Sequence, residues 1–520
     1  MKLHWLDVTA LIFYLGILTL MGIYFSRKNT NTEEYFVGGR SFSGWIVGLS
    51  MVGTSISSVT FLAFPADAFK TAWLRILPGF TLPIAIIISA FVFLPFYRRT
   101  KLISAYEYLE QRFGPSVRTY GALTFTIGQL VRISMILYLL SLLMHEITGL
   151  DPITSILIAG LFVSFYTIVG GIDAVIWTDV LQTMMLILGG VLCLIVIIVN
   201  LPGGLEQIFE IALRDGKMSF GEWKDGEVLN PSWSFTLSKK TALMMLFVGL
   251  TEWFHEYTAN QNVIQRYATA RNIKEARKAM FVSFLNVPIW AFYFFLGTAL
   301  YAFFQVFPTQ DAADMLSGVK KAEQILPFFI VKYLPNGVTG LVIGAAAAAA
   351  MSSLDSSINA ISTIGVHDFY RRLYKKNESD KHYLKIARIL ATIASLIMII
   401  GAILLTQTET KTLQHIIVTV ISVLMGGLMG LFMLGFLTQR GDEKTAWFGI
   451  ILTLVFSTWS VLSGNDLLPG WLSIPFDMYY TGLIGNILIF VSIFLIYVLL
   501  FAKKRDLPNL TIWTQKDKVA

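Results

Sequence analysis

Polar side chains interrupt an otherwise apolar stretch late in the chain, GAAAAAAMSSLDSSINAIS, at residues 344–362. Ser352, Asp355, Ser356 and Asn359 follow one another at spacings of 3, 1 and 3 residues, which places them on one face of a helix. Hydroxyl and carboxylate oxygens are the hard ligands that alkali cations prefer. A buried Asp355 is costly unless it is paired or binds a cation, so we interpret the stripe as a cation site, with a structural ion pair as the alternative.

A second polar interruption lies in the apolar segment GWIVGLSMVGTSISSVTFLAFPADAF, at residues 44–69. Between Gly53 and Thr60 it carries Gly, Ser and Thr where a lipid-facing helix would carry Leu or Ile. Gly weakens a helix by about 1 kcal/mol relative to Ala, and Ser and Thr offer competing hydrogen bonds, so we expect a break in the helix. Carbonyls exposed at membrane depth are tolerated around a cavity or an ion. Close helix packing through small residues is the alternative interpretation.

Two further charged residues lie in apolar segments. Asp179, in GGIDAVIWTDVLQ, is either a helix cap in water or a carboxylate that shares a second cation, or a proton, with Asp355. Arg132 lies within FTIGQLVRISMILYLL and has no acidic residue within a turn. Because a planar guanidinium suits a carboxylate, Arg132 either binds an anionic ligand or pairs with Glu252 or Glu256.

The segment LTEWFHEYTANQNVIQR, which holds these two glutamates, also carries aromatic residues and a histidine. Trp253 and Tyr257 are four residues apart, a spacing found in ordinary packing as well as in a surface that stacks on a sugar. His255 is more often a satisfied polar residue than a proton relay.

The elements that position these side chains are apolar spans. The chain has 520 residues, of which 55% are hydrophobic and 14% charged, whereas soluble domains have about 25% charged residues. Runs of about 20 apolar residues are long enough to cross a bilayer. Such runs recur at residues 5–26, 44–64, 76–97, 119–147, 152–170, 176–200, 241–262, 279–306, 326–362, 384–407, 414–438, 445–463 and 478–502. The sequence therefore predicts an all-α integral membrane protein with thirteen transmembrane helices.

The distribution of basic residues predicts the orientation of these spans. With the N-terminus outside, the inside loops hold 27 of the 40 Lys and Arg residues and the outside segments hold 12. Basic residues accumulate on the cytoplasmic side, so we expect the N-terminus outside and the C-terminus inside. The net charge of +7 lies in short loops rather than on one basic face, which argues against a nucleic-acid partner.

Other sequence features narrow the function further. Cys193 lies in an apolar run and is expected to be a small buried hydrophobe. The histidines lack metal-ligand spacing, and no phosphate-binding Gly-rich loop is present. The longest polar stretches, 201–240 and 307–325, are too short for an independent domain. The tail after Lys503 is short and polar, and we expect it to be a disordered cytoplasmic end.

The motifs resemble those of the sodium:solute symporter family over nearly the whole chain. They are YFVGGR (35–40), ISAYEYLEQRFG (103–114), GGIDAVIWTDVLQ (170–182), NQNVIQRY (260–267) and AMSSLDSSINAIS (350–362). Within the family the chain is most similar to the bacterial sialic-acid symporters, which also have thirteen helices, and next to the sodium/galactose transporters. The resemblance implies a LeuT-type core of two inverted repeats of five helices.

The resemblance also divides the chain into regions. An extra N-terminal helix and a cytoplasmic loop occupy residues 1–43, and the first repeat occupies 44–200. An outside loop at 201–240 precedes the second repeat at 241–438. Two peripheral helices at 439–502 and a cytoplasmic tail at 503–520 complete the chain.

The resemblance implies specific sodium ligands. A first sodium would bind the carbonyls of Gly53, Ile56 and Ala349 and the hydroxyls of Ser352 and Ser353. A second sodium would bind Asp179, Ser352 and Ser356, with Asp355 standing where the sialic-acid symporters carry Ser or Thr. The extra charge of Asp355 either strengthens the second site or turns it into a protonatable pair.

The resemblance implies substrate contacts as well. Hydroxyls of Ser55, Ser57 and Thr60 and the guanidinium of Arg132 match the sialic-acid pattern, in which the arginine binds the sugar carboxylate. Trp253 and Glu256 are further candidates for substrate contact. Gly79 stands where that pattern has a glutamine, which either enlarges the cavity or changes the ligand. The galactose-transporting relatives carry asparagine at the position of Arg132, which favours an acidic sugar.

The expected function is therefore sodium-coupled secondary active symport of a small polar solute by alternating access. An acidic sugar such as N-acetylneuraminate is favoured, and a hexose or another organic solute is the alternative. Sodium, the solute and the lipid bilayer are the expected partners, with no obligate protein partner. An enzyme built on His255, Glu252 and Asp355 lacks a nucleophile and base pair, and a channel or sensor is disfavoured by the short loops. The expected location is the bacterial inner membrane.

Overall fold

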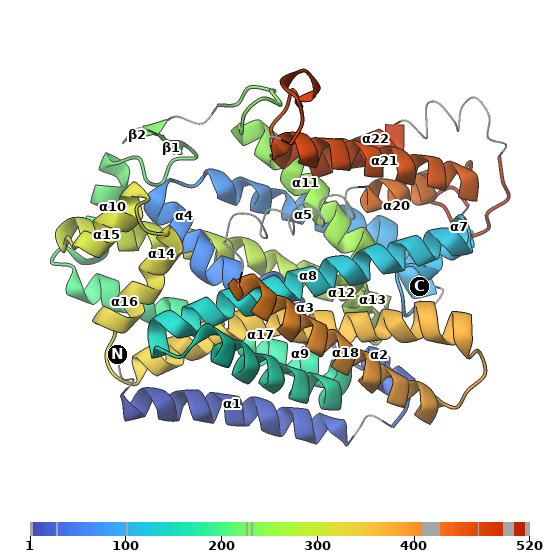
Figure 1. The fold of residues 1–520 in the computed structure, drawn as a ribbon, viewed down its shortest axis with the longest axis horizontal. Helices are drawn as coiled ribbons and strands as arrows, with labels where there is room; N and C mark the ends of the chain where they lie inside the picture. The colour runs from blue at the N-terminus through green and yellow to red at the C-terminus, as the bar shows by residue number, and fades with distance from the viewer. Residues whose placement is uncertain are drawn as a thin grey trace.

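The computed structural model describes residues 4–27, 30–99, 102–224, 227–229, 232–407, 427–465, 467–491 and 504–514. These residues form a bundle of long helices and one small two-stranded hairpin (Figure 1). The predicted all-helical architecture is thus confirmed for the bundle, and the hairpin is an addition in the loop that precedes residue 240.

Short 3-10 and π turns, labelled η, alternate with the α-helices. The first half of the chain contains α1 (Trp5–Ser26), α2 (Thr32–Val37), η1 (Gly38–Arg40), α3 (Gly44–Ser55), η2 (Val59–Ala63), α4 (Phe64–Lys70), η3 (Leu74–Thr81), α5 (Leu82–Ile88), η4 (Ser89–Phe93), α6 (Leu94–Arg99), α7 (Glu107–Arg112), α8 (Pro115–Thr148), α9 (Pro152–Asn200), α10 (Gly204–Arg214), β1 (Glu222–Lys224) and β2 (Glu227–Leu229).

The second half has a similar succession of elements. It contains α11 (Ala242–Ala259), α12 (Gln261–Thr269), α13 (Ile273–Val282), η5 (Ser283–Leu285), α14 (Asn286–Val306), α15 (Gln310–Ser317), η6 (Ala322–Gln324), α16 (Ile325–Tyr333), α17 (Val338–Ile364), η7 (Gly365–Tyr374), α18 (Asp380–Gln407), α20 (Leu428–Leu437), α21 (Glu443–Gly464), η8 (Gly470–Leu472), η9 (Met478–Tyr480) and α22 (Thr481–Val491).

The predicted helix break lies between α3 and η2. α3 ends at Ser55, Ile56 has extended backbone, and the helix axes before and after the break differ by 61°. A second break, at Asn260, separates α11 from α12. The Asn260 side chain accepts from the N–H of Asn262, and the Tyr97 and Tyr106 hydroxyls donate to the carbonyls of Thr258 and Ala259. At the second break, side chains thus replace helical hydrogen bonds that the break removes.

The two predicted spans 152–170 and 176–200 form the single element α9, which is kinked at Gly171. Gly171 has a φ of 59° and a ψ of −160°, a conformation that glycine adopts without steric cost. The kink turns the second half of α9 across α17, against which it packs along much of its length. This crossing brings the polar residues of both helices together.

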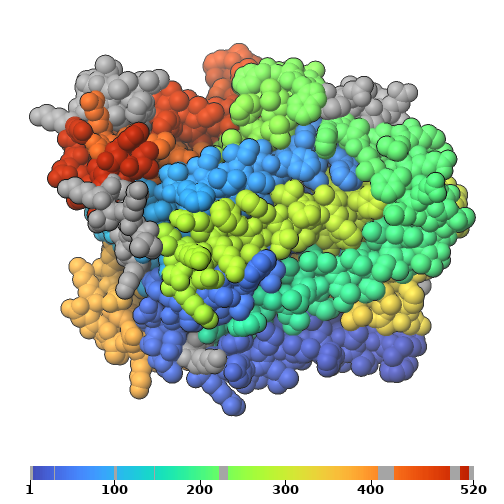
Figure 2. Space-filling view, turned by 180° about the vertical axis from the view of Figure 1, so that it is seen from behind, coloured from blue at the N-terminus to red at the C-terminus, as the bar shows by residue number. Residues whose placement is uncertain are grey.

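The two ends of the bundle carry different parts of the chain. The N-terminus, α10, the hairpin and α15 lie at one end, and α7 and the C-terminal segment lie at the other (Figure 1). At the first end, the buried Lys217 ammonium donates to the carbonyls of Phe69, Lys70 and Thr71 and so closes the C-terminus of α4. Figure 2 shows the back of the bundle as a series of adjacent bands. They are α1, the second half of α9, α13 with α14, and the segment from η3 to α6.

The expectation of a disordered tail after Lys503 is wrong for residues 504–514, which dock on the bundle. The N–H of Ile512 donates to the carbonyl of Phe436, and the Tyr108 hydroxyl donates to the carbonyl of Leu510 at 3.0 Å. Leu507 and Thr511 are buried. The segment docks because it supplies hydrogen-bond partners to the exposed end of α20, where the last helical carbonyls lack donors.

The predicted count of thirteen spans is not settled by the described residues. Within them, eight helices are long and apolar enough to cross a membrane, or nine if the bent pair of α3 and η2 with α4 counts as one span. α9 contains two of the predicted spans, while the spans 414–438 and 478–502 lie partly outside the described residues. The number thirteen therefore stays a prediction.

Candidate functional site

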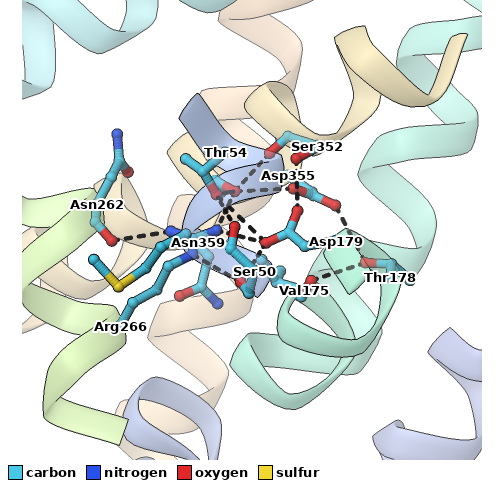
Figure 3. Close-up of polar contacts among 12 residues, drawn as sticks. Ser50, Thr54, Val175, Thr178, Asp179, Asn262, Arg266, Ser352, Asp355 and Asn359 are labelled. Atoms are coloured by element: carbon cyan, nitrogen blue, oxygen red, sulfur yellow. Dashed lines mark hydrogen bonds and ion pairs between the residues drawn. The ribbon is translucent and has the colours of Figure 1, made fainter. Parts of the chain in front are cut away.

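The centre of the bundle is a buried polar cluster between α3, α9, α12 and α17 (Figure 3). Asp179 lies well inside α9, whose N-cap is Asp151, and its side chain is fully buried. The interpretation of Asp179 as a helix cap in water is therefore wrong. It failed because the sequence pattern put the start of a span at residue 176, whereas the helix passes through that position.

Asp179 is neutralised by an arginine from α12. The Nη2 atom of Arg266 lies 2.8 Å from Asp179 Oδ2, and both side chains are almost completely buried. Ser50 of α3 donates to the same carboxylate oxygen at 2.6 Å, and Ser352 of α17 donates to Oδ1 at 2.7 Å. Three helices far apart in sequence thus converge on one carboxylate, as Figure 3 shows.

Asp355 lies beside this ion pair, and no Lys or Arg of the described ranges forms a salt bridge with it. Its side chain is fully buried, and the hydroxyl of Tyr166 donates to Oδ2 at 2.8 Å. Ser356, which also accepts a hydrogen bond from Arg266, lies 3.2 Å from Asp355 Oδ1. The structure therefore brings the four residues predicted for a second cation, Asp179, Ser352, Asp355 and Ser356, into one network.

The residues predicted for the first sodium lie at the break of α3 and in the middle of α17. Gly53 and Ile56 flank the end of α3, while Ala349, Ser352 and Ser353 are buried on α17, and the two helices pack together. The last carbonyls of a helix lack intrahelical donors, so the break leaves carbonyl oxygens available. The Ser353 hydroxyl is buried and has no hydrogen-bond partner in the described part of the chain. This donor set fits a hard monovalent cation.

The small residues of α3 also serve close packing. A Cβ atom on Gly53 would lie 2.5 Å from Thr183 Oγ1 and 3.0 Å from the carbonyl oxygen of Asp179. Only glycine therefore allows α3 to approach α9 this closely. The two interpretations of the segment, a broken helix and tight packing, both hold, because they concern neighbouring residues.

A cavity of about 400 Å³ opens next to the break. Five of the predicted substrate-binding residues line it, namely Ser55, Ser57, Thr60, Arg132 and Trp253. The sixth, Glu256, lines an adjoining cavity of about 370 Å³ together with Glu252 and His255. Arg132, Glu252 and Tyr479 line both cavities, so the two spaces share a wall.

Arg132 makes no ion pair within 4.0 Å to a carboxylate of the described residues. Glu256 instead accepts a hydrogen bond from the Asn260 amide at 2.7 Å. The charge of Arg132 still acts on the Glu256 carboxylate over a longer distance. The alternative of a direct internal pair between Arg132 and Glu252 or Glu256 is thus absent from this conformation. The guanidinium remains available to an anionic group in the cavity.

Gly79 lines the first cavity, but the space that a larger side chain would occupy there is already filled. A Cβ on Gly79 would lie 2.8 Å from the ring of Trp290, which fills the adjacent space. Trp290 stacks on Trp253 with ring centroids 5.0 Å apart, and the Trp253 indole donates to the carbonyl of Pro78. One face of Trp253 is therefore already covered by protein.

The sequence interpretation missed Arg266, Ser50 and Tyr166 as members of the cluster. Arg266 lies in the motif NQNVIQRY, which indicates the family but does not by itself show that Arg266 is buried. The signal that points to Arg266 is the conflict between a buried Asp179 and the need for a counter-charge. Tyr257, by contrast, is buried in the core and lines neither cavity.

Comparisons with known proteins agree on one family. A model of the sodium:solute symporter family matches residues 35–453. The sodium/sialic acid symporter of Proteus mirabilis is 34% identical over 95% of this chain and 95% of its own. The sodium/sialic acid symporter of Aliivibrio fischeri is 32% identical over 94% of this chain and 92% of its own. The solved structure of a sodium-coupled sialic acid symporter in a substrate-bound outward-open state superimposes with a TM-score of 0.83, at 30% identity over 96% of this chain and 99% of that one.

Proposed function

The chain belongs to the sodium:solute symporter family, and we propose that it imports an acidic sugar such as N-acetylneuraminate together with sodium. One observation carries the choice of an acidic solute. Arg132 faces a cavity lined by Ser55, Ser57 and Thr60 and has no carboxylate partner within 4.0 Å among the described residues. A guanidinium in such a place stabilises a carboxylate by paired hydrogen bonds, while the hydroxyls suit the neutral groups of a sugar.

Sodium coupling follows from the family and from the relatives, which are named as sodium symporters. We place the first sodium between the carbonyls of Gly53, Ile56 and Ala349 and the hydroxyls of Ser352 and Ser353. The unpartnered hydroxyl of Ser353 supports this assignment. The site borders the helix break that also borders the cavity, so sodium and solute stabilise the same arrangement of α3 and α17.

We also propose a second cation at the cluster of Asp179, Ser352, Asp355 and Ser356. Two carboxylates face one guanidinium, so the cluster carries one negative charge in excess when both acids are ionised. An uncompensated charge at this depth is expensive, and a monovalent cation removes that cost. Two sodium ions with one monoanion would move one net charge inward, which is worth about 2.3 kcal/mol per 100 mV. We therefore expect electrogenic uptake.

The proposed architecture is the LeuT-type inverted repeat with thirteen spans, the N-terminus outside and the C-terminus inside. The order of elements supports it, because each half begins with a broken helix, α3 with α4 in the first and α11 with α12 in the second. The position of the termini at opposite ends of the bundle agrees with an odd number of spans. We propose the bacterial inner membrane as its location, which the sialic acid symporters of Proteus mirabilis and Aliivibrio fischeri among its relatives support.

The test is transport by purified protein in proteoliposomes. We expect an inward sodium gradient to drive uptake of labelled N-acetylneuraminate, and Arg132→Ala to abolish most of it. Galactose added in excess should compete poorly. Uptake of N-acetylneuraminate that is the same with and without the sodium gradient would contradict the proposal.

A sodium/hexose symporter is the second candidate, because Glu252 and Glu256 share a cavity with Arg132 and oppose its charge. Sodium-driven uptake of galactose alone, unaffected by Arg132→Ala, would favour it. That result would retain sodium coupling and discard the acidic solute.

A further inference from the structure

We propose that the second sodium binds on the Asp355 side of the cluster, among Asp355, Thr178, Gln182 and Tyr14, and that Arg266 acts as the fixed counter-ion of Asp179. This inference rests on the proposed function, since it locates the second coupling ion within it. It differs from a site centred on Asp179, because it places the mobile ion between α1, α9 and α17.

Asp179 already has three close hydrogen-bond donors, one of which is charged. Its Oδ2 atom accepts from Ser50 at 2.6 Å and from Arg266 at 2.8 Å, and its Oδ1 atom accepts from Ser352 at 2.7 Å. The charge of Arg266 balances that of Asp179 directly. A cation bound to Oδ2 of Asp179 would have to displace the guanidinium, which is buried and also bonded to Ser50 and to the carbonyl of Asn262. At either oxygen, Arg266 already supplies the counter-charge that Asp179 needs.

Three hydroxyls lie within hydrogen-bonding distance of the Asp355 carboxylate, but two of them donate their proton elsewhere. A hydroxyl has a single proton to donate. The proton of Thr178 is used by the carbonyl of Ala174 at 2.8 Å, although its oxygen lies 3.4 Å from Asp355 Oδ2. The proton of Ser356 is used by the carbonyl of Ser352 at 2.6 Å, although its oxygen lies 3.2 Å from Asp355 Oδ1. Among the residues that the structure describes, only Tyr166 donates to Asp355 without a competing acceptor of its own.

When Asp355 is ionised, the oxygen atoms around it therefore face one another with lone pairs instead of protons. Such a spacing is typical of ligands that share a cation. Oxygen ligands lie about 2.4 Å from a hard cation of this size, so neighbouring ligands lie about 3.4 Å apart. The separation between Thr178 Oγ1 and Asp355 Oδ2 has this value.

Two further oxygen atoms near Asp355 are buried and unpartnered among the described residues. They are Oε1 of Gln182 and the hydroxyl of Tyr14. The Gln182 amide nitrogen lies 3.4 Å from the Tyr166 hydroxyl that bonds Asp355. The Tyr14 hydroxyl interacts electrostatically with the Asp355 carboxyl and with the Gln182 side chain, without a hydrogen bond of standard geometry. Both side chains are buried beyond nine-tenths. An ion beside Asp355 would satisfy both.

The charges agree with this placement. The charged side chains that face the cluster are Asp179 of α9, Arg266 of α12 and Asp355 of α17. The positive charge of Arg266 neutralises Asp179, and the charge of one sodium ion would neutralise Asp355. The site selects a single monovalent cation, because a divalent ion would leave a positive excess in the membrane interior.

The test is equilibrium binding of ²²Na⁺ to the purified full-length protein without solute. We expect the wild type to bind two ions and Asp355→Asn to bind one. Tyr14→Phe and Gln182→Leu each remove one ligand and should weaken the second ion about tenfold while leaving the first unchanged. Tyr35→Phe serves as the control, because the Tyr35 hydroxyl is buried but bonds the carbonyl of Ile168 away from the cluster.

The outcomes separate this inference from the proposed function. Wild-type binding of one ion, or binding of two ions at unchanged affinity in both Tyr14→Phe and Gln182→Leu, overturns the placement of the second sodium. The Tyr14→Phe variant is conservative, so it keeps the test decisive if Asp355→Asn does not fold. Sodium-independent solute uptake by the wild type would instead overturn the proposed function, whatever the ion count.

Discussion

Arg266 Nη2 lies 2.8 Å from Asp179 Oδ2 at the centre of the bundle, and this ion pair ties the short helix α12 to the long helix α9. The two residues lie 87 positions apart in the sequence. Because the pair also contacts Ser50 of α3 and Ser356 of α17, it links both helix breaks to the helix that carries the proposed sodium ligands. A change in any of these helices therefore alters the environment of the same carboxylate.

The first prediction concerns this pair. Arg266→Ala leaves Asp179 buried and unpaired, so we expect a loss of about 3 to 5 kcal/mol in the free energy of unfolding. Asp179→Asn combined with Arg266→Gln removes both charges and should recover part of that loss. Thermal unfolding in detergent measures both. A double variant no more stable than Arg266→Ala would contradict the assigned pairing.

A second prediction concerns Ser353. Its unpartnered hydroxyl is assigned to the first sodium, so Ser353→Ala should raise the sodium concentration needed for half-maximal uptake at least tenfold, with little effect on the unfolding temperature. Ser362→Ala is the matched control on the same stretch of polar residues. The Ser362 hydroxyl donates to the carbonyl of Ala387, so its loss should cost about 1 kcal/mol of stability and leave the sodium dependence unchanged.

The third prediction tests the packing of Gly79. A side chain at this position meets the ring of Trp290, so Gly79→Ala should displace the stack of Trp290 on Trp253 and raise the KM for solute several-fold. Trp290→Leu removes the same stack. We therefore expect Gly79→Ala to raise the KM much less in the Trp290→Leu background than in the wild type. Identical KM values for Gly79→Ala and the wild type would show that the ring moves without cost.

The fourth prediction is a dependence of stability on pH. Burial lowers the pKa of Lys217 to about 7, and the nearby Asp215 carboxylate offsets only part of this effect. In the unfolded chain a lysine has a pKa of about 10.4. Between pH 7 and 10 the unfolded state therefore binds the additional proton, and the free energy of unfolding rises with pH, by at most about 1.4 kcal/mol per unit. Below pH 7 both states hold the proton and this contribution is flat.

Thermal unfolding of wild type and Lys217→Met across pH 6 to 10 checks this dependence. The variant should lack the rise that the wild type shows above pH 7. Lys239→Met, which changes an exposed lysine of the same loop, should retain it. Parallel curves for wild type and Lys217→Met would rule out Lys217 as the source.

A fifth prediction concerns the docked C-terminal segment. Tyr108→Phe removes the hydrogen bond to the carbonyl of Leu510 and should cost about 1 kcal/mol. It should also speed proteolytic cleavage within residues 504–514, because the segment separates more often from α20. Equal cleavage rates in variant and wild type would mean that the remaining contacts suffice to hold it.

The sequence alone determined the membrane class and the family, because both depend on local patterns. Apolar runs of about 20 residues reveal spans wherever they occur, and the SSLDSS stripe marks a polar face from its spacing alone. The break near Gly53 was predictable for the same reason. Five of the six predicted substrate residues line one cavity because they lie on the break itself or on helices next to it.

Only the tertiary structure decided which charges neutralise one another. Whether Asp179 is a cap or a buried partner depends on the passage of α9 through residue 176, which is set by the kink at Gly171 and the packing on α17. The choice of Arg266 as its counter-ion depends on the second helix break, which turns α12 toward the cluster. Hydropathy records how apolar a segment is, whereas an ion pair in the membrane interior depends on distances between helices that no local pattern contains.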